Sequence, residues 1–440
     1  MGLKTFPGGI HPHDSKHFSK DRSIEEIPLP KKVIIPLSQH IGAISKPIVK
    51  VGDEVLVGQK IAEPGGFVSI PMHASISGKI TKIDKFPHPT GIMAMGIEIT
   101  SDEKDKWIKL TDDENYMELS VDEMKKHVAN AGICGMGGAG FPTHVKLSPP
   151  PEKPIDTLII NGVECEPYLT ADYRIMLEQA DDIINGLKIL KKILGAKKGI
   201  VGIEANKPDA IKLFKKLLKN ESDIKVIGLK LKYPQGAEKQ LIYAILKRVV
   251  PAKGGLPMDI GVVVQNVGTA IAVYEAVRYK KPFIDRVITI SGKIVKNPKN
   301  VKARIGVLFS ELLDFCDGTY EEIGKVISGG PMMGFAIPSL ETPMIKGSSG
   351  LILFDKKEAH KDEESTCLRC GRCVDVCPMN LVPSLIAHNV RHEDWEMTEK
   401  YGVMDCMKCG SCAYVCPSHI KLIQWIDIGK IKVTEKQNQG

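Results

Sequence analysis

The sequence lacks the features that mark several common classes of protein. No run of about 18 uninterrupted apolar residues occurs, so a membrane span is not expected, and the apolar stretch 260–277 is broken by Gln265, Asn266 and Glu275. The first residues contain no apolar signal-peptide core, and Phe6 stands where N-myristoylation needs Ser or Thr. Any association with a membrane is therefore expected to come through partner proteins.

Aromatic residues make up only 5% of the chain, and the lysines behind its net charge of +7 are scattered along it. Nucleic-acid-binding proteins usually gather basic residues on one face. No nucleic-acid ligand is therefore expected. We interpret the charged residues as part of a solvated surface, which could face an acidic redox partner or an anionic nucleotide.

Cysteine is scarce until the C-terminal region. Before Cys367 the chain holds only Cys134, Cys165 and Cys316, which is too few for a disulfide framework and typical of a reducing compartment. The other eight cysteines form two runs with one spacing, each followed by proline: Cys367-x2-Cys370-x2-Cys373-x3-Cys377-Pro378 and Cys406-x2-Cys409-x2-Cys412-x3-Cys416-Pro417.

This spacing is that of bacterial ferredoxins, in which three close thiolates hold one [4Fe–4S] cluster and the fourth reaches the other cluster. Structural zinc is the alternative, because zinc also takes Cys-x2-Cys pairs. The repeated 2-2-3 steps and the prolines favour two clusters. Their expected ligand sets cross over, with Cys367, Cys370, Cys373 and Cys416 for one and Cys406, Cys409, Cys412 and Cys377 for the other.

With 440 residues, 43% of them hydrophobic, the chain can form several domains. Residues 1–28 form a Pro/Gly-rich arm with His11, His13 and His17 but no Cys or carboxylate framework nearby, so a solvated or partner-bound arm is expected rather than a metal site. Residues 29–105 alternate β-branched residues with Gly and Pro turns, as short-stranded β domains do. They resemble the barrel-sandwich (lipoyl-like) fold of biotinyl and lipoyl carriers.

A carrier needs a lysine on the hairpin between the two halves of that fold, and none lies between Lys60 and Lys79. A carrier-protein function is therefore disfavoured. The β module is expected to have a docking or structural role.

Residues 115–282 change to apolar segments at 155–161, 199–203, 224–231 and 258–265, separated by stretches of helical period. This alternation predicts a Rossmann-like parallel sheet covered on both faces, with ligand sites at the carboxyl ends of its strands. Residues 283–355 return to β character around a helix at 306–315 and resemble a small β-grasp domain of the soluble-ligand-binding (SLBB) type. A charged linker, 356–364, leads into a helical, ferredoxin-type two-cluster domain at 360–440. The fold class is thus multidomain α/β.

A glycine-rich segment, Gly135-Met-Gly-Gly-Ala-Gly-Phe-Pro-Thr-His144, precedes the first of these strands. Glycine lets the backbone approach a ligand closely, and successive N–H groups can cradle an anion. The segment is not the Rossmann fingerprint, because Phe141-Pro142 follows where a helix should open. Taken alone, it is equally well explained as an ordinary turn.

Three further elements follow in order: Asn161-Gly-Val-Glu-Cys-Glu-Pro167, Tyr233-Pro-Gln-Gly-Ala-Glu238 and Asn266-Val-Gly-Thr269. Together with the glycine-rich segment they resemble the FMN- and NADH-binding flavoprotein subunit of respiratory complex I. When the barrel-sandwich module and the cysteine runs are added, the whole chain resembles the C subunit of the Rnf ion-translocating NAD:ferredoxin oxidoreductase (electron transport) complex.

The resemblance implies particular cofactor-binding positions. The chain departs from the complex I pattern at Met136, where that pattern has Arg, and at Ala237 and Gly268, where it has Glu, so three polar contacts are missing. FMN is implied at Gly135, Gly137, Lys146, Asn161, Glu164, Tyr233, Gly236, Asn266 and Thr269, and NADH at Gly138, Phe141, Glu166 and Glu238.

The function implied is that of an NADH-linked oxidoreductase subunit. NADH gives electrons as a hydride pair and a cluster passes them singly, so FMN is expected between NAD(H) and the clusters, with no side chain acting as general acid or base. The expected partners are the other subunits of the membrane complex and ferredoxin, and the expected location is peripheral, on the cytoplasmic face of the cell membrane. The alternative is a non-catalytic iron–sulfur relay or scaffold with a lapsed nucleotide pocket, which the three departures favour.

Overall fold

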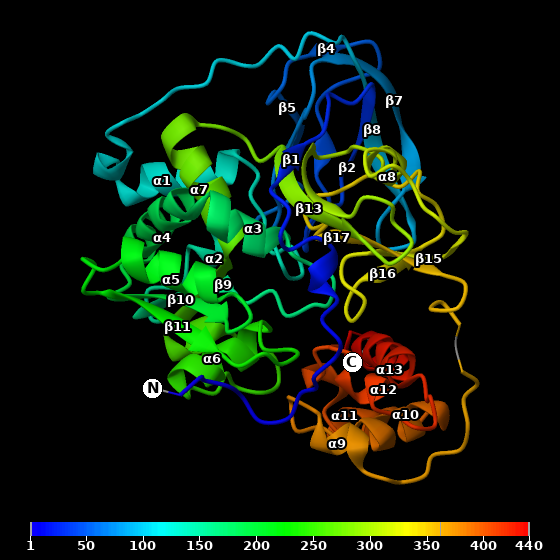
Figure 1. Ribbon diagram of the computed structural model, residues 1–440. Helices are drawn as coiled ribbons and strands as arrows, with labels where there is room; N and C mark the ends of the chain where they lie inside the picture. The colour runs from blue at the N-terminus through cyan, green and yellow to red at the C-terminus, as the bar shows by residue number, and fades with distance from the viewer. Residues whose placement is uncertain (1, 361, 439–440) are drawn as a thin grey trace.

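The computed structural model describes residues 2–360 and 362–438 and contains the four expected modules (Figure 1). The N-terminal module is a barrel sandwich of two antiparallel sheets. Ile80, Ile97 and Ile99 are fully buried in its core, as the alternation of side chains along a half-buried strand requires. Its strands are β2 (Lys32–Pro36), β8 (Met93–Ser101), β7 (Gly78–Pro87) and β4 (Glu54–Val55) in one sheet and β3 (Lys46–Pro47), β5 (Lys60–Glu63) and β6 (Met72–His73) in the other.

The second module has the predicted parallel sheet, in the order β11-β10-β9-β12. Its strands are β9 (Thr157–Gly162), β10 (Lys198–Glu204), β11 (Ile224–Leu229) and β12 (Val262–Asn266). Alternate residues of β9 face opposite sides, since Leu158 and Ile160 join one hydrophobic cluster while Ile159 joins another. The expectation that both faces are covered is thus confirmed.

Helices cover the two faces of this sheet unequally. Helices α4 (Ala180–Leu194) and α7 (Val267–Tyr279) pack on the face of Leu158, while α6 (Glu238–Leu246) packs on the face of Ile159. The other helices of the module are α1 (Val121–Asn130), α2 (Thr143–Lys146), α3 (Ala171–Glu178) and α5 (Pro208–Leu217), with short 3-10 turns at Tyr116–Glu118 and Pro257–Ile260.

The β-grasp module is a six-stranded mixed sheet in the order β1-β14-β13-β17-β15-β16. One edge strand, β1, comes from the N-terminal arm and pairs in parallel with β14. The elements are β1 (Glu25–Glu26), β13 (Asp285–Ser291), β14 (Lys299–Arg304), β15 (Ile323–Ser328), β16 (Phe335–Ile337), β17 (Gly350–Asp355) and the helix α8 (Phe309–Asp314).

The arm itself corrects one expectation, because it is not a solvated segment. Phe6 and Ile10 are only 3% and 4% exposed. The arm runs past the α/β module and the C-terminal domain before it reaches β1 (Figure 1). The sequence did not reveal this docking, since the residues that cover the arm lie far away along the chain.

The C-terminal domain is helical, and its two halves repeat one local geometry. Gly371 and Gly410, with φ of +76° and +79°, directly precede the four-residue helices that carry Cys373 and Cys412. Its helices are α9 (Arg372–Asp375), α10 (Pro383–Arg391), α11 (Trp395–Lys400), α12 (Ser411–Tyr414) and α13 (Leu422–Gln437). Among the residues that the structure describes, no helix has both the length and the apolar character needed to cross a bilayer.

Candidate functional site

The motif residues meet at the carboxyl edge of the parallel sheet. Asn161 lies at the end of β9 and Asn266 at the end of β12, and these strands are neighbours. Asn161 donates a hydrogen bond from Nδ2 to the main-chain oxygen of Gly236 (2.8 Å), in the loop between β11 and α6. Because parallel strands end at one edge, the topology alone brings together three motifs from distant parts of the sequence.

The glycine-rich loop, residues 135–140, lies against the first turn of α7. The Met136 amide donates to Thr269 Oγ1 (3.0 Å), and a Cβ on Gly137 would lie 3.1 Å from Asn266 Nδ2. Gly137 has φ of +71°, and a Cβ on Gly138 would meet nothing within 4 Å. The loop therefore presents open, exposed backbone beside a helix N-terminus, which fits an anionic group such as a flavin or nucleotide phosphate.

Two of the departures from the complex I pattern are packed against each other. A Cβ on Gly268 would lie 2.8 Å from Met136 Sδ. The methionine therefore fills the space that a side chain at position 268 would take. These two changes form one local replacement rather than two independent losses.

Asn266 and Glu164 organise the helices that begin at this edge. Asn266 caps α7 by accepting from the Gly268 amide (2.8 Å) and donates from Nδ2 to Asp172 Oδ2 (2.6 Å). Glu164, with φ of +48°, accepts from the amides of Asp172 (2.7 Å) and Tyr173 (3.2 Å) in the first turn of α3. Burial raises the pKa of Glu164 to about 7.

Glu166 is turned toward the β-grasp module. Its two carboxylate oxygens accept from the amides of Met332 (3.0 Å) and Met333 (2.9 Å). Burial raises its pKa to about 7 as well. Glu166 therefore ties the acidic loop to the turn between β15 and β16, and no oxygen of its carboxylate is left without a partner.

Lys146 and Glu238 form an ion pair between α2 and the first residue of α6, with 2.6 Å between Nζ and Oε1. Both side chains are partly exposed. Phe141, at the end of the glycine-rich loop, is half-buried. These three residues therefore remain accessible at the edge of the site.

Two buried lysines beneath the site were not found from the sequence. Lys207 is 1% exposed; its Nζ donates to the main-chain oxygen of Val163 (2.7 Å) and lies 3.6 Å from Glu204 Oε2. Lys16, from the arm, is 4% exposed and donates to the main-chain oxygen of Glu166 (2.9 Å). Glu204 is the last residue of β10 and Lys207 follows it at the same edge of the sheet, and that position was the available signal.

Tyr233 connects this edge to the cysteine-rich domain. The side chain is 1% exposed, and its hydroxyl donates to the main-chain oxygen of Cys409 (2.7 Å). Burial raises its pKa. Cys165 accepts from the Gly236 amide (3.3 Å), and burial raises the pKa of its thiol to about 12. A raised pKa is the opposite of what an activated thiolate shows.

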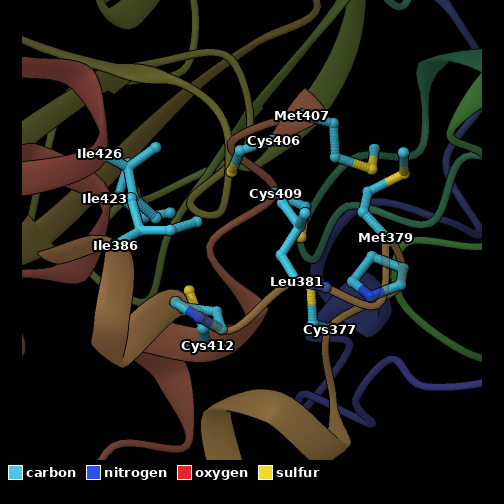
Figure 2. A pocket seen from close by; sticks show the side chains of 12 residues that line it. Cys377, Met379, Leu381, Ile386, Cys406, Met407, Cys409, Cys412, Ile423 and Ile426 are labelled. Atoms are coloured by element: carbon cyan, nitrogen blue, oxygen red, sulfur yellow. The ribbon is translucent and has the colours of Figure 1, made fainter. Parts of the chain in front are cut away.

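Four cysteines from both runs surround one apolar pocket in the C-terminal domain (Figure 2). They are Cys377 from the first run and Cys406, Cys409 and Cys412 from the second, with Leu381, Ile386, Ile423 and Ile426 among the apolar residues around them. This grouping is the second of the crossed ligand sets expected from the spacing. An apolar pocket lined by thiols fits an iron–sulfur cluster, whose potential depends on burial.

The other four cysteines include two that lie at the surface. Cys373 and Cys416 pack against one small apolar cluster that includes Leu422, whereas Cys367 and Cys370 are exposed. The two runs are held side by side, since the Ser365 amide donates to the Ser418 oxygen (3.0 Å) and Ser418 Oγ to the Thr366 oxygen (2.9 Å). The first residue of one run therefore lies near the end of the other.

Within residues 2–360 and 362–438, no three His, Cys, Asp or Glu side chains gather as the ligands of a single metal ion. Four thiolates on one zinc ion would lie only about 3.8 Å apart, given a Zn–S distance of about 2.3 Å. A [4Fe–4S] cluster instead binds each cysteine through a different iron. It accommodates a wider spread of sulfur atoms.

Comparison with known families divides the chain into four matched regions. The RnfC barrel sandwich hybrid domain matches residues 4–104 and the Nuo51 FMN-binding domain matches residues 128–275. The SLBB domain matches residues 287–336, and the 4Fe-4S dicluster domain matches residues 359–417.

Two relatives match nearly the whole chain, across all four of these regions. The C subunit of the proton-translocating ferredoxin:NAD(+) oxidoreductase complex of Clostridium ljungdahlii is 51% identical, over 96% of this chain and 93% of the relative. The C subunit of the Na(+)-translocating ferredoxin:NAD(+) oxidoreductase complex of Acetobacterium woodii is 47% identical, over 99% and 98%.

A solved structure of similar fold is the NAD+-reducing [NiFe]-hydrogenase in the H2-reduced state. It matches with a TM-score of 0.51 and 17% identity, over 74% of this chain and 65% of that one. At this identity the likeness concerns the fold alone.

Proposed function

The chain belongs to the family of C subunits of ion-translocating ferredoxin:NAD(+) oxidoreductase complexes, and from that premise we propose that it links NAD(H) to the rest of such a complex. It exchanges electrons with NAD(H) in the α/β module and passes them one at a time through two [4Fe–4S] clusters. The observation that carries this proposal is the contact between Tyr233 of the nucleotide module and Cys409 of the cysteine-lined pocket. It joins the two redox sites within one fold.

FMN bound at the carboxyl edge supplies the conversion between the electron pair of NADH and the single electrons of the clusters. The residues of the chain bind the flavin and the nucleotide and orient them. The glycine-rich loop and the first turn of α7 offer amides to phosphate, and Lys146 offers a cation. The residues proposed for FMN are Gly135, Gly137, Lys146, Asn161, Glu164, Tyr233, Gly236, Asn266 and Thr269.

For NADH we propose Gly138, Phe141, Glu166 and Glu238. Phe141 lies at the edge of the site, where an aromatic face can stack on a base or nicotinamide ring, and Glu238 can accept from a ribose hydroxyl. Glu166 acts by holding its loop, since its oxygens already accept two amides. The proposed cluster ligands are the crossed sets of four cysteines, which the grouping of Cys377 with Cys406, Cys409 and Cys412 supports.

The proposed partners are the other subunits of the membrane complex and ferredoxin, reached directly or through those subunits. The proposed location is peripheral, on the cytoplasmic face of the cell membrane. There the nucleotide edge meets NAD(H), and the exposed cysteines of the first run, Cys367 and Cys370, lie where a partner can approach.

The second candidate is a relay whose nucleotide pocket has lapsed. The packing of Met136 over Gly268 favours it, because an apolar side chain fills space near the glycine-rich loop. The accessible Lys146–Glu238 pair and the open backbone at Gly138 oppose it.

Anaerobic purification followed by iron, sulfide and flavin analysis and titration with NADH decides between the two. We expect acid-labile sulfide, bound flavin and bleaching of the flavin absorbance by NADH. Clusters with no flavin bleaching would support the relay. Zinc without sulfide would overturn both.

A further inference from the structure

The N-terminal arm is anchored first to the α/β module. Lys4 extends the sheet beyond β11: its amide donates to the Gly228 oxygen (3.3 Å), and its own oxygen accepts from the Lys230 amide (2.9 Å). Phe6 is buried, with Lys232 Nζ donating to its main-chain oxygen (3.0 Å) and lying 4.7 Å from its ring centre. This part of the arm is therefore held by both backbone and side-chain contacts.

The next residues pass between Tyr233 and the cysteine-rich domain. Ile10 and Tyr233 exchange two backbone hydrogen bonds of 2.8 and 2.9 Å, and the Gly9 amide donates to the Val376 oxygen (2.8 Å). A Cβ on Gly8 would lie 3.0 Å from the Cys377 oxygen. The buried side chain of Ile10 packs in one cluster with Tyr233 and Cys409. Each side of the junction thus makes backbone contact with the arm.

Besides the arm, direct hydrogen bonds also link the two sides of this junction. Tyr233 donates to the Cys409 oxygen, Gln240 Nε2 to the Pro378 oxygen (3.0 Å), and, farther from the arm, the Lys253 amide to Asp405 Oδ1 (2.6 Å). Met332 of the β-grasp module lies near Gly410. The covalent connection includes exposed residues 362–366, of which Ser365 and Thr366 are hydrogen-bonded to Ser418 of the cysteine-rich domain. These bonds lie within one side of the junction and do not link it to the α/β module.

We propose that residues 4–10 of the arm are a positioning element, which holds the pocket of Cys377, Cys406, Cys409 and Cys412 at electron-transfer distance from the nucleotide edge. This inference rests on the proposed function. Electron transfer weakens steeply as the gap between donor and acceptor widens, so a small displacement of the domain slows transfer without altering either redox site.

Gly9 offers a sharp test because its surroundings leave no space for a side chain. Its φ is +79°, and a Cβ there would lie 2.6 Å from the Tyr233 main-chain oxygen. Gly195, with φ of +62° and nothing within 4 Å of a Cβ, is the matched control. Gly9→Ala and Gly195→Ala carry a similar left-handed backbone penalty, but only the first pushes the arm off Tyr233.

The first measurement is hydrogen exchange on the full-length protein without NADH. In Gly9→Ala we expect faster exchange in peptides covering residues 228–236 and 372–380, with both unchanged in Gly195→Ala. The second is anaerobic rapid mixing with NADH, in which flavin bleaching keeps its rate while the paramagnetic signal of the reduced clusters appears roughly 10-fold or more slowly. Equal exchange and equal cluster reduction in the two variants would overturn the proposal.

Ile10→Ala keeps the test decisive if Gly9→Ala folds poorly. Its control is Ile44→Ala, since Ile44 is 59% exposed. The same two differences are expected, and their absence would overturn the positioning role. Failure of the proposed function would look different, because the wild-type protein would then show no flavin bleaching by NADH while the exchange difference remained.

Discussion

The hydroxyl of Tyr233 donates a 2.7 Å hydrogen bond to the main-chain oxygen of Cys409, across the boundary between the nucleotide module and the cysteine-rich domain. Tyr233→Phe removes the donor and leaves a buried carbonyl without this partner, which costs about 1–3 kcal/mol. Anaerobic urea unfolding followed by tryptophan fluorescence measures the loss. Tyr320→Phe, at a side chain that is 72% exposed, should leave the midpoint unchanged, and an equal loss there would refute the assignment.

Lys146 and Glu238 are partly exposed, so their ion pair should add little to stability, on the order of 0–1 kcal/mol. The proposed role of Lys146 is to bind FMN, and that of Glu238 is to bind NADH. Lys146→Met is therefore expected to lower the flavin content per chain several-fold while the melting temperature changes little. The control is Lys153→Met, which breaks an ion pair of the same 2.6 Å length to Asp259 at the surface. Equal flavin content in both variants would contradict the role of Lys146.

Burial raises the pKa of Glu166 to about 7, from an ordinary value of 4.5. Between these values the folded protein holds a proton that the unfolded chain has released, so this group makes stability fall as pH rises from about 4.5 to 7. Glu166→Gln removes that dependence. The melting temperature of the variant minus that of wild type should therefore increase from pH 5 to pH 7.5. Each kcal/mol of difference in the free energy of unfolding corresponds to roughly 2–4 °C. The exposed Glu54→Gln should show no such trend.

The sequence predicted the modules because their signals are local. The alternation of apolar segments indicates a parallel sheet, and the repeated 2-2-3 cysteine spacing indicates a two-cluster domain. The crossed cysteine sets stay a prediction, which the pocket of Cys377, Cys406, Cys409 and Cys412 supports for one cluster. The sequence did not predict the burial of Lys16 and Lys207, since lysine is almost never fully buried unless paired. The carbonyl oxygens that accept from them, those of Glu166 for Lys16 and Val163 for Lys207, lie far away along the chain, although Glu204 is only three residues from Lys207. The docking of Ile10 on Tyr233 was not predicted either, because the two residues lie far apart along the chain.

Lys207 is buried beside Glu204, and the opposite charge of each side chain reduces the free-energy cost of burying the other. Desolvation lowers the pKa of Lys207 and burial raises that of Glu204. Lys207→Met leaves a buried carboxylate without its cation and should cost about 3–5 kcal/mol. Lys207→Met combined with Glu204→Gln should recover most of this loss in urea unfolding. A double variant as unstable as the sum of both single changes would show that the two side chains act independently.

The crossed assignment of the cysteines can be tested by pairing substitutions. Loss of one ligand from either cluster gives the same iron content under crossed or uncrossed assignments, so single variants do not discriminate. Cys377→Ser combined with Cys406→Ser removes two ligands from one cluster if the sets cross, as the shared pocket indicates, and half of the iron should remain. Cys377→Ser combined with Cys370→Ser then damages both clusters, and little iron should remain. The reverse result would assign each run to its own cluster, because uncrossed sets place Cys370 and Cys377 together and separate Cys377 from Cys406.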